Sequence, residues 1–325
     1  MQANTSNLTK KPEVTLTPMS AALSENNPVI SRRELKALMK RSNLPGLKHL
    51  ALWLCLLAAT STLVWLSLDS VWLLLPALFL HGVVMVHHFA LQHECSHYTA
   101  FRSRWLCNAL AAICGFLLFI PPRFFRYEHC DHHTFTNIAG KDPELIELPQ
   151  RRWQYLLYLS AIPYWYGQFG GIMRRAAGRI NDSEKKFLPA TELSAVVLES
   201  RLMVLGYLIV ASWSIAADSL VAMIFWWLPL LFGEPVMRFI RMAEHVGRPM
   251  IADRHVNTRT SLVSRLWRFL AWNMNFHAEH HYAASVPFHA LEKLHERLRD
   301  SVYVEEGGYW QAHVDIRQRM SVKKA

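Results

Sequence analysis

Residues 50–97 read LALWLCLLAATSTLVWLSLDSVWLLLPALFLHGVVMVHHFALQHECSH, and this segment is the most informative about the fold. It holds two apolar runs, Leu50–Leu68 and Val71–Gln92, joined by Asp69 and Ser70 alone. At about 1.5 Å per residue, each run is long enough to cross the roughly 30 Å of hydrocarbon in a bilayer. The short link predicts that the two runs form a tight transmembrane hairpin of helices.

A second pair of apolar runs lies further along the chain, at Leu202–Ala217 and Ser219–Gly233, linked around Asp218. Both runs are shorter than an ideal span, so they either extend past these bounds or match a thinner bilayer. Two further apolar stretches, Trp105–Pro122 and Trp153–Met173, are interrupted or bounded by Pro and Gly and are rich in aromatic residues. We expect these two to be interfacial or half-buried helices.

The composition is typical of a protein that crosses a membrane several times. Of 325 residues, 52% are apolar, and apolar stretches with few charges alternate with segments rich in Arg and Lys. Basic residues that flank the apolar runs explain the net charge of +10, so no nucleic-acid partner is expected. Neither hairpin tip carries Lys or Arg, which predicts that all the long connecting segments face the cytoplasm.

The N-terminal region differs from the rest of the chain. Residues 1–30 are rich in Ser, Thr, Asn and Pro, which predicts a disordered tail followed by a single domain over residues 31–325. Ser31 and Glu34 have the spacing of a capping box, so we expect a short basic helix that ends near Asn43.

Three groups of histidines carry the chemistry of this sequence. They are His93-Glu94-Cys95-Ser96-His97, His129-Cys130-Asp131-His132-His133 and His277-Ala278-Glu279-His280-His281. On a helix, positions i, i+3 and i+4 share a face, so each group aims two or three imidazoles at one point. Neutral imidazole binds zinc, copper, iron and nickel. Eight histidines exceed the coordination number of one ion, so two metal ions close together are expected.

Carboxylates and cysteines also lie within or near the three histidine groups. Carboxylates could hold each ligand in one tautomer, and the candidates are Glu94, Asp131, Asp142, Glu144 and Glu279. Cys95 and Cys130 could themselves bind a metal, but each lies between histidines that are already well spaced to do so. We interpret both as space-filling residues. Five cysteines without a C-x-x-C pair also argue against a disulfide framework.

The pattern H-x-x-x-H, H-x-x-H-H and H-x-x-H-H, each group placed after an apolar segment, resembles the membrane fatty-acid desaturase and hydroxylase family. The resemblance covers roughly residues 45–297 and includes His132-His133-Thr134, Asp142-Pro143 and Asn273-x-Asn275-Phe276-His277. It implies an all-α integral membrane protein with two transmembrane helical hairpins, interfacial helices and a cytoplasmic histidine-rich cap.

The resemblance also implies a metal centre. In that family a further histidine before the third group often completes the ligand set, and His245 is the matching candidate. The implied ligands of two non-haem iron ions are His93, His97, His129, His132, His133, His245, His277, His280 and His281. The family uses O2 as co-substrate to remove hydrogen from an unactivated C–H bond, which leaves either a double bond or an alcohol. Both outcomes stay open here.

Substrate and partners follow from the same resemblance. A fatty acyl chain fits the family and the membrane setting, and another lipid-like or small apolar substrate is the alternative. Two electrons per turnover would come from a separate ferredoxin, rubredoxin or cytochrome b5 with its reductase, because no haem segment or cysteine cluster is present. We expect this donor to dock on a basic cytoplasmic surface that includes Arg123 or Arg126. The expected location is a bacterial inner membrane.

Other classes of protein fit this sequence less well. His93 to His97 also match H-E-x-x-H, the zinc metalloprotease signature, in which Glu94 would be the general base. A membrane protease needs one further ligand and leaves the other two groups unexplained. A haem-bearing cytochrome would place single histidines on facing helices, and a metal carrier would string its ligands through the spans.

The remaining histidines have less specific settings. His81 falls inside the second apolar run, where it is either functional or a neutral side chain bonded to a neighbouring helix. His87 and His88 are expected beside the ligands rather than among them. His289 and His295 are expected to be structural or to lie just outside the metal site. We expect solvated surface positions for His49, His255 and His313.

Overall fold

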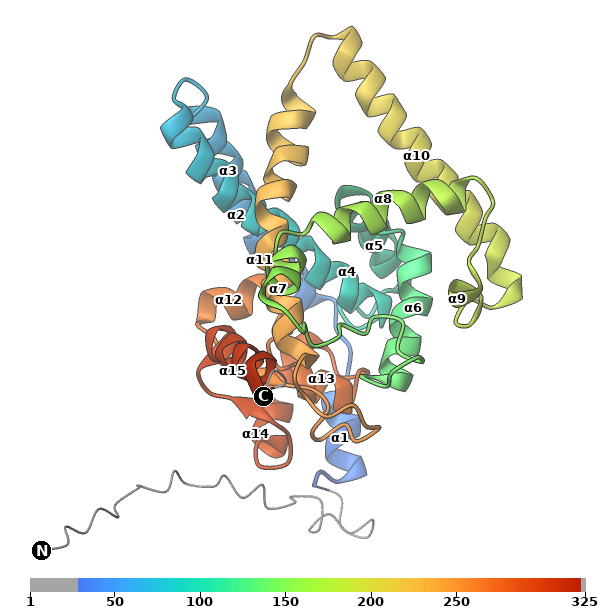
Figure 1. Cartoon of the computed structure of the whole chain (residues 1–325), viewed down its shortest axis with the longest axis vertical. Coiled ribbons are helices and arrows are strands. Elements are labelled where there is room, and N and C mark those ends of the chain that lie inside the picture. Colours follow the sequence, from blue (N-terminus) through green and yellow to red (C-terminus); the bar gives the residue numbers. More distant parts are fainter. Residues whose placement is uncertain (1–28, 323–325) are drawn as a thin grey trace, which may run out of the picture.

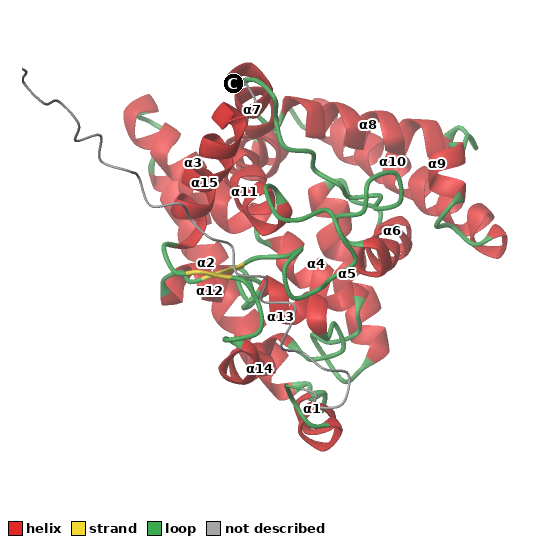
Figure 2. Ribbon diagram, turned by 60° about the horizontal axis from the view of Figure 1, so that its bottom comes forward, coloured by secondary structure: helices red, strands yellow, loops and turns green. Residues whose placement is uncertain are grey.

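The computed structural model describes residues 29–322, so almost all of the predicted tail lies outside the described residues. Within this range the chain is mostly helical. The only strands among the described residues are β1 (Thr260–Ser261) and β2 (Val304–Glu305), which pair in parallel and appear in yellow in Figure 2. The helical fold class predicted from the sequence is therefore confirmed.

The first helices differ from the prediction in their bounds. The capping box of Ser31 and Glu34 is present, but α1 (Arg32–Leu38) ends well before Asn43. The prediction that it continues to that residue was wrong. Asn43 instead lies just before α2 (Leu44–Leu66). Pro45 falls in the first turn of α2, where a proline is well accommodated, so the helix can begin here.

The second apolar run forms two helices in sequence. Helix α3 (Val71–Val86) packs against α2, and α4 (His88–Ser96) continues from it after His87. Together they give an apolar stretch over Val71–Ser96. The first group of histidines therefore lies at the end of a long helical segment that starts among apolar residues.

The second apolar pair is longer than the sequence predicted. It consists of α10 (Leu193–Ala216), the π-helical turn η3 (Met223–Trp227) and α11 (Leu228–His245). The short runs therefore extend past their predicted bounds. Figure 1 shows α10 and α11 diverging from their shared turn, so that α11 packs against α3 and α10 packs against α8 (Ile162–Ala176).

Four helical segments of the described chain are long and apolar enough to cross a membrane: Leu44–Leu66, Val71–Ser96, Ala190–Ala216 and Met223–His245. Large apolar side chains on them are uncovered, for example Trp72 at 81% exposure and Ile215 at 81%. Soluble proteins rarely expose apolar patches of this extent, whereas lipid covers them without cost. These four helices fit a membrane protein.

Helices α3 and α11 approach each other at two glycines. A Cβ atom at Gly82 would lie 2.1 Å from the carbonyl oxygen of Pro229, and one at Gly233 would lie 2.2 Å from the carbonyl oxygen of Gly82. Small residues at such crossings let the backbones of membrane helices pack closely. The contact fixes α11, which ends at His245, against the helix that leads into α4.

The two aromatic stretches are broken helices. Helices α5 (Arg104–Leu118) and α6 (Pro122–Phe135) meet at an angle of 98°. Helix α7 (Arg152–Leu159) is separated from α8 by a break at Ala161, whose φ is +60°. The short α9 (Asp182–Lys185) and the 3-10 turn η2 (Ala190–Glu192) then lead into α10.

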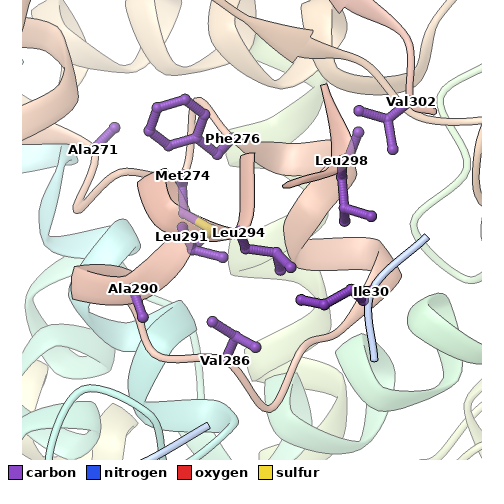
Figure 3. Packing of buried hydrophobic residues seen from close by; sticks show 11 residues of the cluster. Ile30, Ala271, Met274, Phe276, Val286, Ala290, Leu291, Leu294, Leu298 and Val302 are labelled. Carbon is purple, nitrogen blue, oxygen red and sulfur yellow. The ribbon is translucent and has the colours of Figure 1, made fainter. Parts of the chain in front are cut away.

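The C-terminal part of the chain consists of short helices and turns. It contains α12 (Arg265–Leu270), α13 (His277–Tyr282), the 3-10 turn η4 (Phe288–Ala290), α14 (Leu291–Leu298) and α15 (Gly308–Val322). Figure 3 shows the apolar cluster of this part of the chain, which contains Leu294 and Leu298 of α14 together with Phe276. Ile30 belongs to the same cluster at 4% exposure, so this end of the predicted tail is part of the folded core.

Candidate metal centre

Nine histidines from four segments of the chain converge in the body of the molecule. They form two clusters, in each of which one nitrogen per residue lies within 4.8 Å of the others. The first cluster contains His93, His97, His129, His133 and His280. The second cluster contains His132, His245, His277 and His281. These are the nine histidines singled out in the sequence, and the structure brings all of them together.

Helical spacing explains how the side chains are distributed. His129 and His133 are four residues apart on α6 and enter the first cluster, while His132 between them enters the second. On α13, His277 and His281 enter the second cluster and His280 enters the first. Both helices therefore contribute to both clusters, which makes the clusters adjacent. The rings of His133 and His281 stack across the boundary with centroids 4.2 Å apart.

The nitrogen positions fit metal coordination. The Nε2 atom of His133 lies 3.0 Å from those of His129 and His280. In the second cluster, the Nε2 atom of His277 lies 3.0 Å from that of His245 and 3.2 Å from that of His281. Ligands about 2.1 Å from an ion and at right angles to one another are separated by about 3.0 Å. One ion in each cluster is compatible with these separations.

Several of these nitrogens are buried without a protein partner. They include both ring nitrogens of His93 and the Nε2 atoms of His97 and His132. Buried polar atoms in native proteins nearly always have a partner, because leaving one unpaired costs free energy. A bound cation would satisfy these atoms, and an all-imidazole donor set suits zinc, copper, nickel and iron.

Neighbouring groups hold three of the histidines in one tautomer. The Nδ1–H of His129 donates to Glu144 at 2.7 Å, and that of His132 donates to Asp142 at 2.8 Å. The Nδ1 of His281 lies 3.0 Å from the hydroxyl of Thr136, which itself donates to a backbone carbonyl and so accepts here. In each case the Nε2 lone pair is left free for a metal.

The other three candidate carboxylates do not bond to a clustered histidine. Glu94 is fully buried and accepts the backbone N–H of Phe288 at 3.1 Å. Glu279 accepts from His295 at 2.6 Å and from the hydroxyl of Thr260. Asp131 makes no hydrogen bond or ion pair with any described residue. Three of the five nominated carboxylates therefore do not contact a clustered histidine.

The contacts of Thr260 and Glu94 show what these two residues do. Thr260 donates to Glu279 and accepts the backbone N–H of Ala278 at 3.2 Å, so it orients the third histidine group. Glu94 is engaged by the Phe288 backbone, and its two neighbours His93 and His97 belong to a five-histidine cluster. This arrangement does not place Glu94 as the general base of a metalloprotease.

Sequence reasoning missed a buried ion-pair network on α11. Arg241 binds Glu144 at 2.5 Å and Glu244 at 2.9 Å, and an oxygen of Glu244 lies 3.7 Å from the Nε2 of His277. Arg241 thus connects a carboxylate beside the first cluster with one beside the second. The spacing of Arg241, Glu244 and His245 at i, i+3 and i+4 on one helix was the signal that could have revealed it.

Burial keeps the histidines of α13 neutral. It lowers the pKa of His277, His280 and His281 well below the ordinary value of imidazole, and neighbouring histidines lower it further. Neutral imidazole is the form that binds a metal, so these histidines would not need to lose a proton to bind an ion at pH 7.

The remaining histidines and cysteines lie outside both clusters. His81 bonds to the hydroxyl of Thr60 at 2.9 Å and the carbonyl of Phe225 at 3.2 Å, which supports the neutral, helix-bridging alternative. His87 and His88 bond to carbonyls of their own helical segment. Cys95 is buried, Cys130 is exposed, and neither joins a cluster.

The prediction of solvated surface positions was wrong for three histidines. His313 is 2% exposed and bonds to Phe239 O at 2.8 Å and to the Tyr155 hydroxyl at 2.9 Å. His49 and His255 are partly buried and each donates to a backbone carbonyl at 2.8 Å. The segments that cover them are distant in the chain, so their burial has no local signature in the sequence.

The two arginines proposed for donor docking are engaged within the chain. Arg123 binds Glu192 at 2.5 Å. Arg126 binds the hydroxyl of Tyr98 at 2.5 Å and the side chain of Asn108 at 2.9 Å. Both therefore have a role in packing α6 against its neighbours.

Two cavities adjoin the clusters. An inner chamber of about 20 Å³ is lined by His93 of the first cluster and His277 of the second, together with apolar side chains such as Met237 and Met274. A larger outer pocket of about 480 Å³ lies among α6, α7, α8 and α11. Phe89 and Arg241 line both cavities and separate them.

We expect the substitution Asp142→Asn to weaken metal binding by about 10- to 100-fold, because the carboxylate that orients His132 is lost. Competition with a chelator would measure this change. Asp131→Asn is the matched control, since Asp131 lies beside His132 in sequence but contacts no clustered histidine. Equal losses in the two variants would contradict the assigned role of Asp142.

The chain is similar to known proteins over most of its length. A family model described as fatty acid desaturase matches residues 70–313. The chain is 28% identical over 133 residues to an sn-1 oleoyl-lipid 12-desaturase of Picosynechococcus sp., a match that spans 40% of this chain and 38% of that relative. It is 20% identical over 259 residues to an sn-1 oleoyl-lipid 12-desaturase of Anabaena variabilis, spanning 73% and 72% of the two chains. It is 25% identical over 248 residues to a chloroplastic omega-6 fatty acid desaturase of Glycine max, spanning 71% and 57%.

Proposed function

Because this chain belongs to the fatty acid desaturase family, we propose that it is a membrane-bound oxidoreductase that desaturates a lipid-linked fatty acyl chain with O2 and external electrons. The observation that carries the proposal is the pair of adjoining histidine clusters with nitrogens directed inward. The relatives are named as desaturases that act on oleoyl lipids or fatty acids, which favours loss of hydrogen over insertion of oxygen.

In this proposal each cluster holds one iron ion. His93, His97, His129, His133 and His280 would hold the first, and His132, His245, His277 and His281 the second. The bound ions would supply the oxidising chemistry that removes hydrogen from an unactivated C–H bond. The carboxylates of Asp142 and Glu144 keep their histidines in the metal-binding tautomer, and Arg241 holds Glu144 in place.

The inner chamber would receive the reacting part of the substrate. Its lining contains one histidine from each cluster, so a methylene group placed there would lie beside both proposed ions. Met237, Ile240 and Met274 give the chamber an apolar wall. Such a wall fits a hydrocarbon chain and excludes water, which would otherwise compete with the substrate at the site.

The membrane setting of the proposal rests on the four apolar helices. We place α2–α3 and α10–α11 as two transmembrane hairpins and the clusters on the cytoplasmic side of a bacterial inner membrane. The links at residues 67–70 and 217–222 lack Lys and Arg, whereas the segments at the opposite ends are basic. A separate donor of ferredoxin, rubredoxin or cytochrome b5 type would deliver electrons from the same side.

The direct test is product analysis in a host that supplies electron donors. Expression of the chain is expected to produce acyl lipids that have lost two hydrogens, as detected by mass spectrometry of total lipid. A host that expresses His133→Ala serves as the control and should show no such product. Lipids that have gained one oxygen atom would indicate hydroxylation in place of desaturation. Unchanged lipids in a host whose protein is loaded with iron would contradict the proposal that the substrate is an acyl chain.

A further inference from the structure

A separate pocket of about 670 Å³ lies at the start of α2 and is rich in positive charge. It is formed where the segment between α1 and α2 meets the loop before α5 and the helix α14. Among the described residues that line it there is no Asp or Glu. Four of them are cationic, namely Lys40, Arg41, Arg102 and Lys293, and we call this site the basic pocket.

The four cations have no partners within the described chain. Their side chains make no hydrogen bond or ion pair with any residue that the structure describes. The carboxylate of Glu292, next to Lys293 in sequence, is instead bound to Arg268 at 2.6 Å. Like charges that converge on one space repel one another, and a cleft of one sign concentrates ions of the opposite sign. The basic pocket therefore favours an anion.

The fold holds the walls of this pocket together. The side chain of Asn43 accepts the backbone N–H of Ser103 at 3.0 Å, which ties the start of α2 to the loop that carries Arg102. A Cβ atom at Gly46 would lie 2.3 Å from the carbonyl oxygen of Ala100, so α2 and this loop are in close contact. Helix α1 packs against α14, and Figures 1 and 2 show the two side by side. The cations are thus gathered around one space by packed elements.

One edge of the basic pocket is apolar and uncovered. Leu44 lines the pocket, is 59% exposed, and is the first residue of a helix that is long and apolar enough to span a membrane. Leu47 is exposed one turn further along, and Trp105 in the first turn of α5 is 72% exposed. Exposed Trp and cations at the end of an apolar helix are typical of a membrane interface. A ligand that has both an anionic head and apolar chains fits this edge better than a small anion does.

We propose that the basic pocket binds the phosphate of an anionic phospholipid in the leaflet nearest the histidine clusters, with the acyl chains along Leu44 and Leu47. The guanidinium groups of Arg41 and Arg102 would donate to phosphate oxygens, and the two lysines would add favourable charge. This lipid is distinct from the proposed substrate, because the basic pocket shares no lining residue with the inner chamber or the outer pocket. The inference depends on the membrane placement of α2 and not on the proposed reaction.

Titration of lipid into the purified full chain in detergent micelles tests this site, with the midpoint of thermal unfolding as the readout, since a ligand of the folded state raises it. The probes are dioleoylphosphatidylglycerol, which is anionic, and dioleoylphosphatidylcholine, which has the same acyl chains and no net charge. We expect the wild type to bind the anionic lipid more tightly. Arg102→Gln combined with Lys293→Gln removes a cation from each of two walls. It should weaken this binding by roughly 25-fold, at about 5-fold for each cation.

Arg32→Gln combined with Arg33→Gln is the matched control. Both arginines are exposed on α1 outside the pocket, and the net charge of the protein changes by the same amount. This variant should bind the anionic lipid nearly as the wild type does. The side chains removed from the pocket have no partners in the described chain, so both double variants should unfold at the wild-type midpoint when no lipid is added.

Three results would overturn the proposal. Equal weakening in the two double variants would show diffuse attraction to net charge in place of a site. Inorganic phosphate that raises the midpoint as much as the anionic lipid would make the pocket a site for a free ion. A pocket variant that binds the lipid normally but no longer accepts electrons from its donor would assign this surface to an acidic protein. Lipid binding is measured without turnover, so the site and the proposed reaction are tested independently.

Discussion

His280→Ala is expected to abolish turnover and to release the ion of the first cluster. His280 lies in the middle of that cluster, with its ring centroid 4.6 Å from that of His93 and 4.8 Å from that of His97. Its Nε2 atom is 3.0 Å from that of His133. Changes to groups that merely orient a ligand cost about 10- to 100-fold, so removal of the ligand should cost at least about 100-fold in activity. Iron content and lipid products, measured on the same preparation, would report both effects.

His289→Ala is the matched control for this experiment. His289 is a half-buried histidine that follows Phe288 on the turn η4 and lies outside both clusters. This variant should retain the iron and the activity of the wild type. If His280→Ala kept its iron and its product, His280 would be removed from the ligand set.

Gly82→Ala is expected to destabilise the whole protein. The added Cβ would lie 2.1 Å from the carbonyl oxygen of Pro229 and 2.9 Å from the backbone nitrogen of Gly233, and backbone atoms cannot rotate away. Helices α3 and α11 would have to separate, which moves His245 relative to the histidines at the end of α4. Overpacking of this kind costs roughly 1–3 kcal/mol or more. We expect a lower midpoint of thermal unfolding in detergent together with loss of metal.

The chain offers a control in which the same substitution has room. A Cβ atom at Gly167 on α8 would have no other atom within 4 Å. Gly167→Ala should therefore leave the midpoint unchanged or raise it, by up to about 1 kcal/mol in the free energy of unfolding, because alanine favours the helix. Equal shifts for Gly82→Ala and Gly167→Ala would show that the α3–α11 crossing is not tightly packed.

The histidines that come together were predictable, but their division into two clusters was not. Spacing at i, i+3 and i+4 identifies histidines that share a helix face, and that reasoning brought out His93, His97 and the histidines of α6 and α13. It does not say that His132 enters one cluster while His129 and His133 enter the other. That division depends on how α6 and α13 approach each other, and their residues are far apart in the sequence.

The bounds of the helices show a related limit. Hydropathy locates the apolar middle of a span, and it identified Leu202–Ala217 and Ser219–Gly233 correctly as helical. The helices continue to polar residues such as Arg241 and His245 because protein, rather than lipid, surrounds that end of α11. A polar residue buried by a distant segment has no local signature. The same reason explains the misplaced His313.

Proximity in sequence predicted only some of the carboxylates that bond to the clustered histidines. Asp142 and Glu144 were nominated because they follow the second histidine group, and they do hold His132 and His129. Glu94 and Glu279 lie inside their groups but point to the backbone of η4 and to His295. On a helix, a residue next to a ligand in sequence points about 100° away from it, so neighbours are poor candidates for contact.

The most direct test of the two-cluster account is the metal content of the purified protein and of one variant in each cluster. We predict two iron ions per chain in the wild type, with the first ion lost in His280→Ala and the second lost in His245→Ala, because each histidine belongs to one cluster. A single zinc ion without iron, or one ion that both variants remove together, would contradict the account.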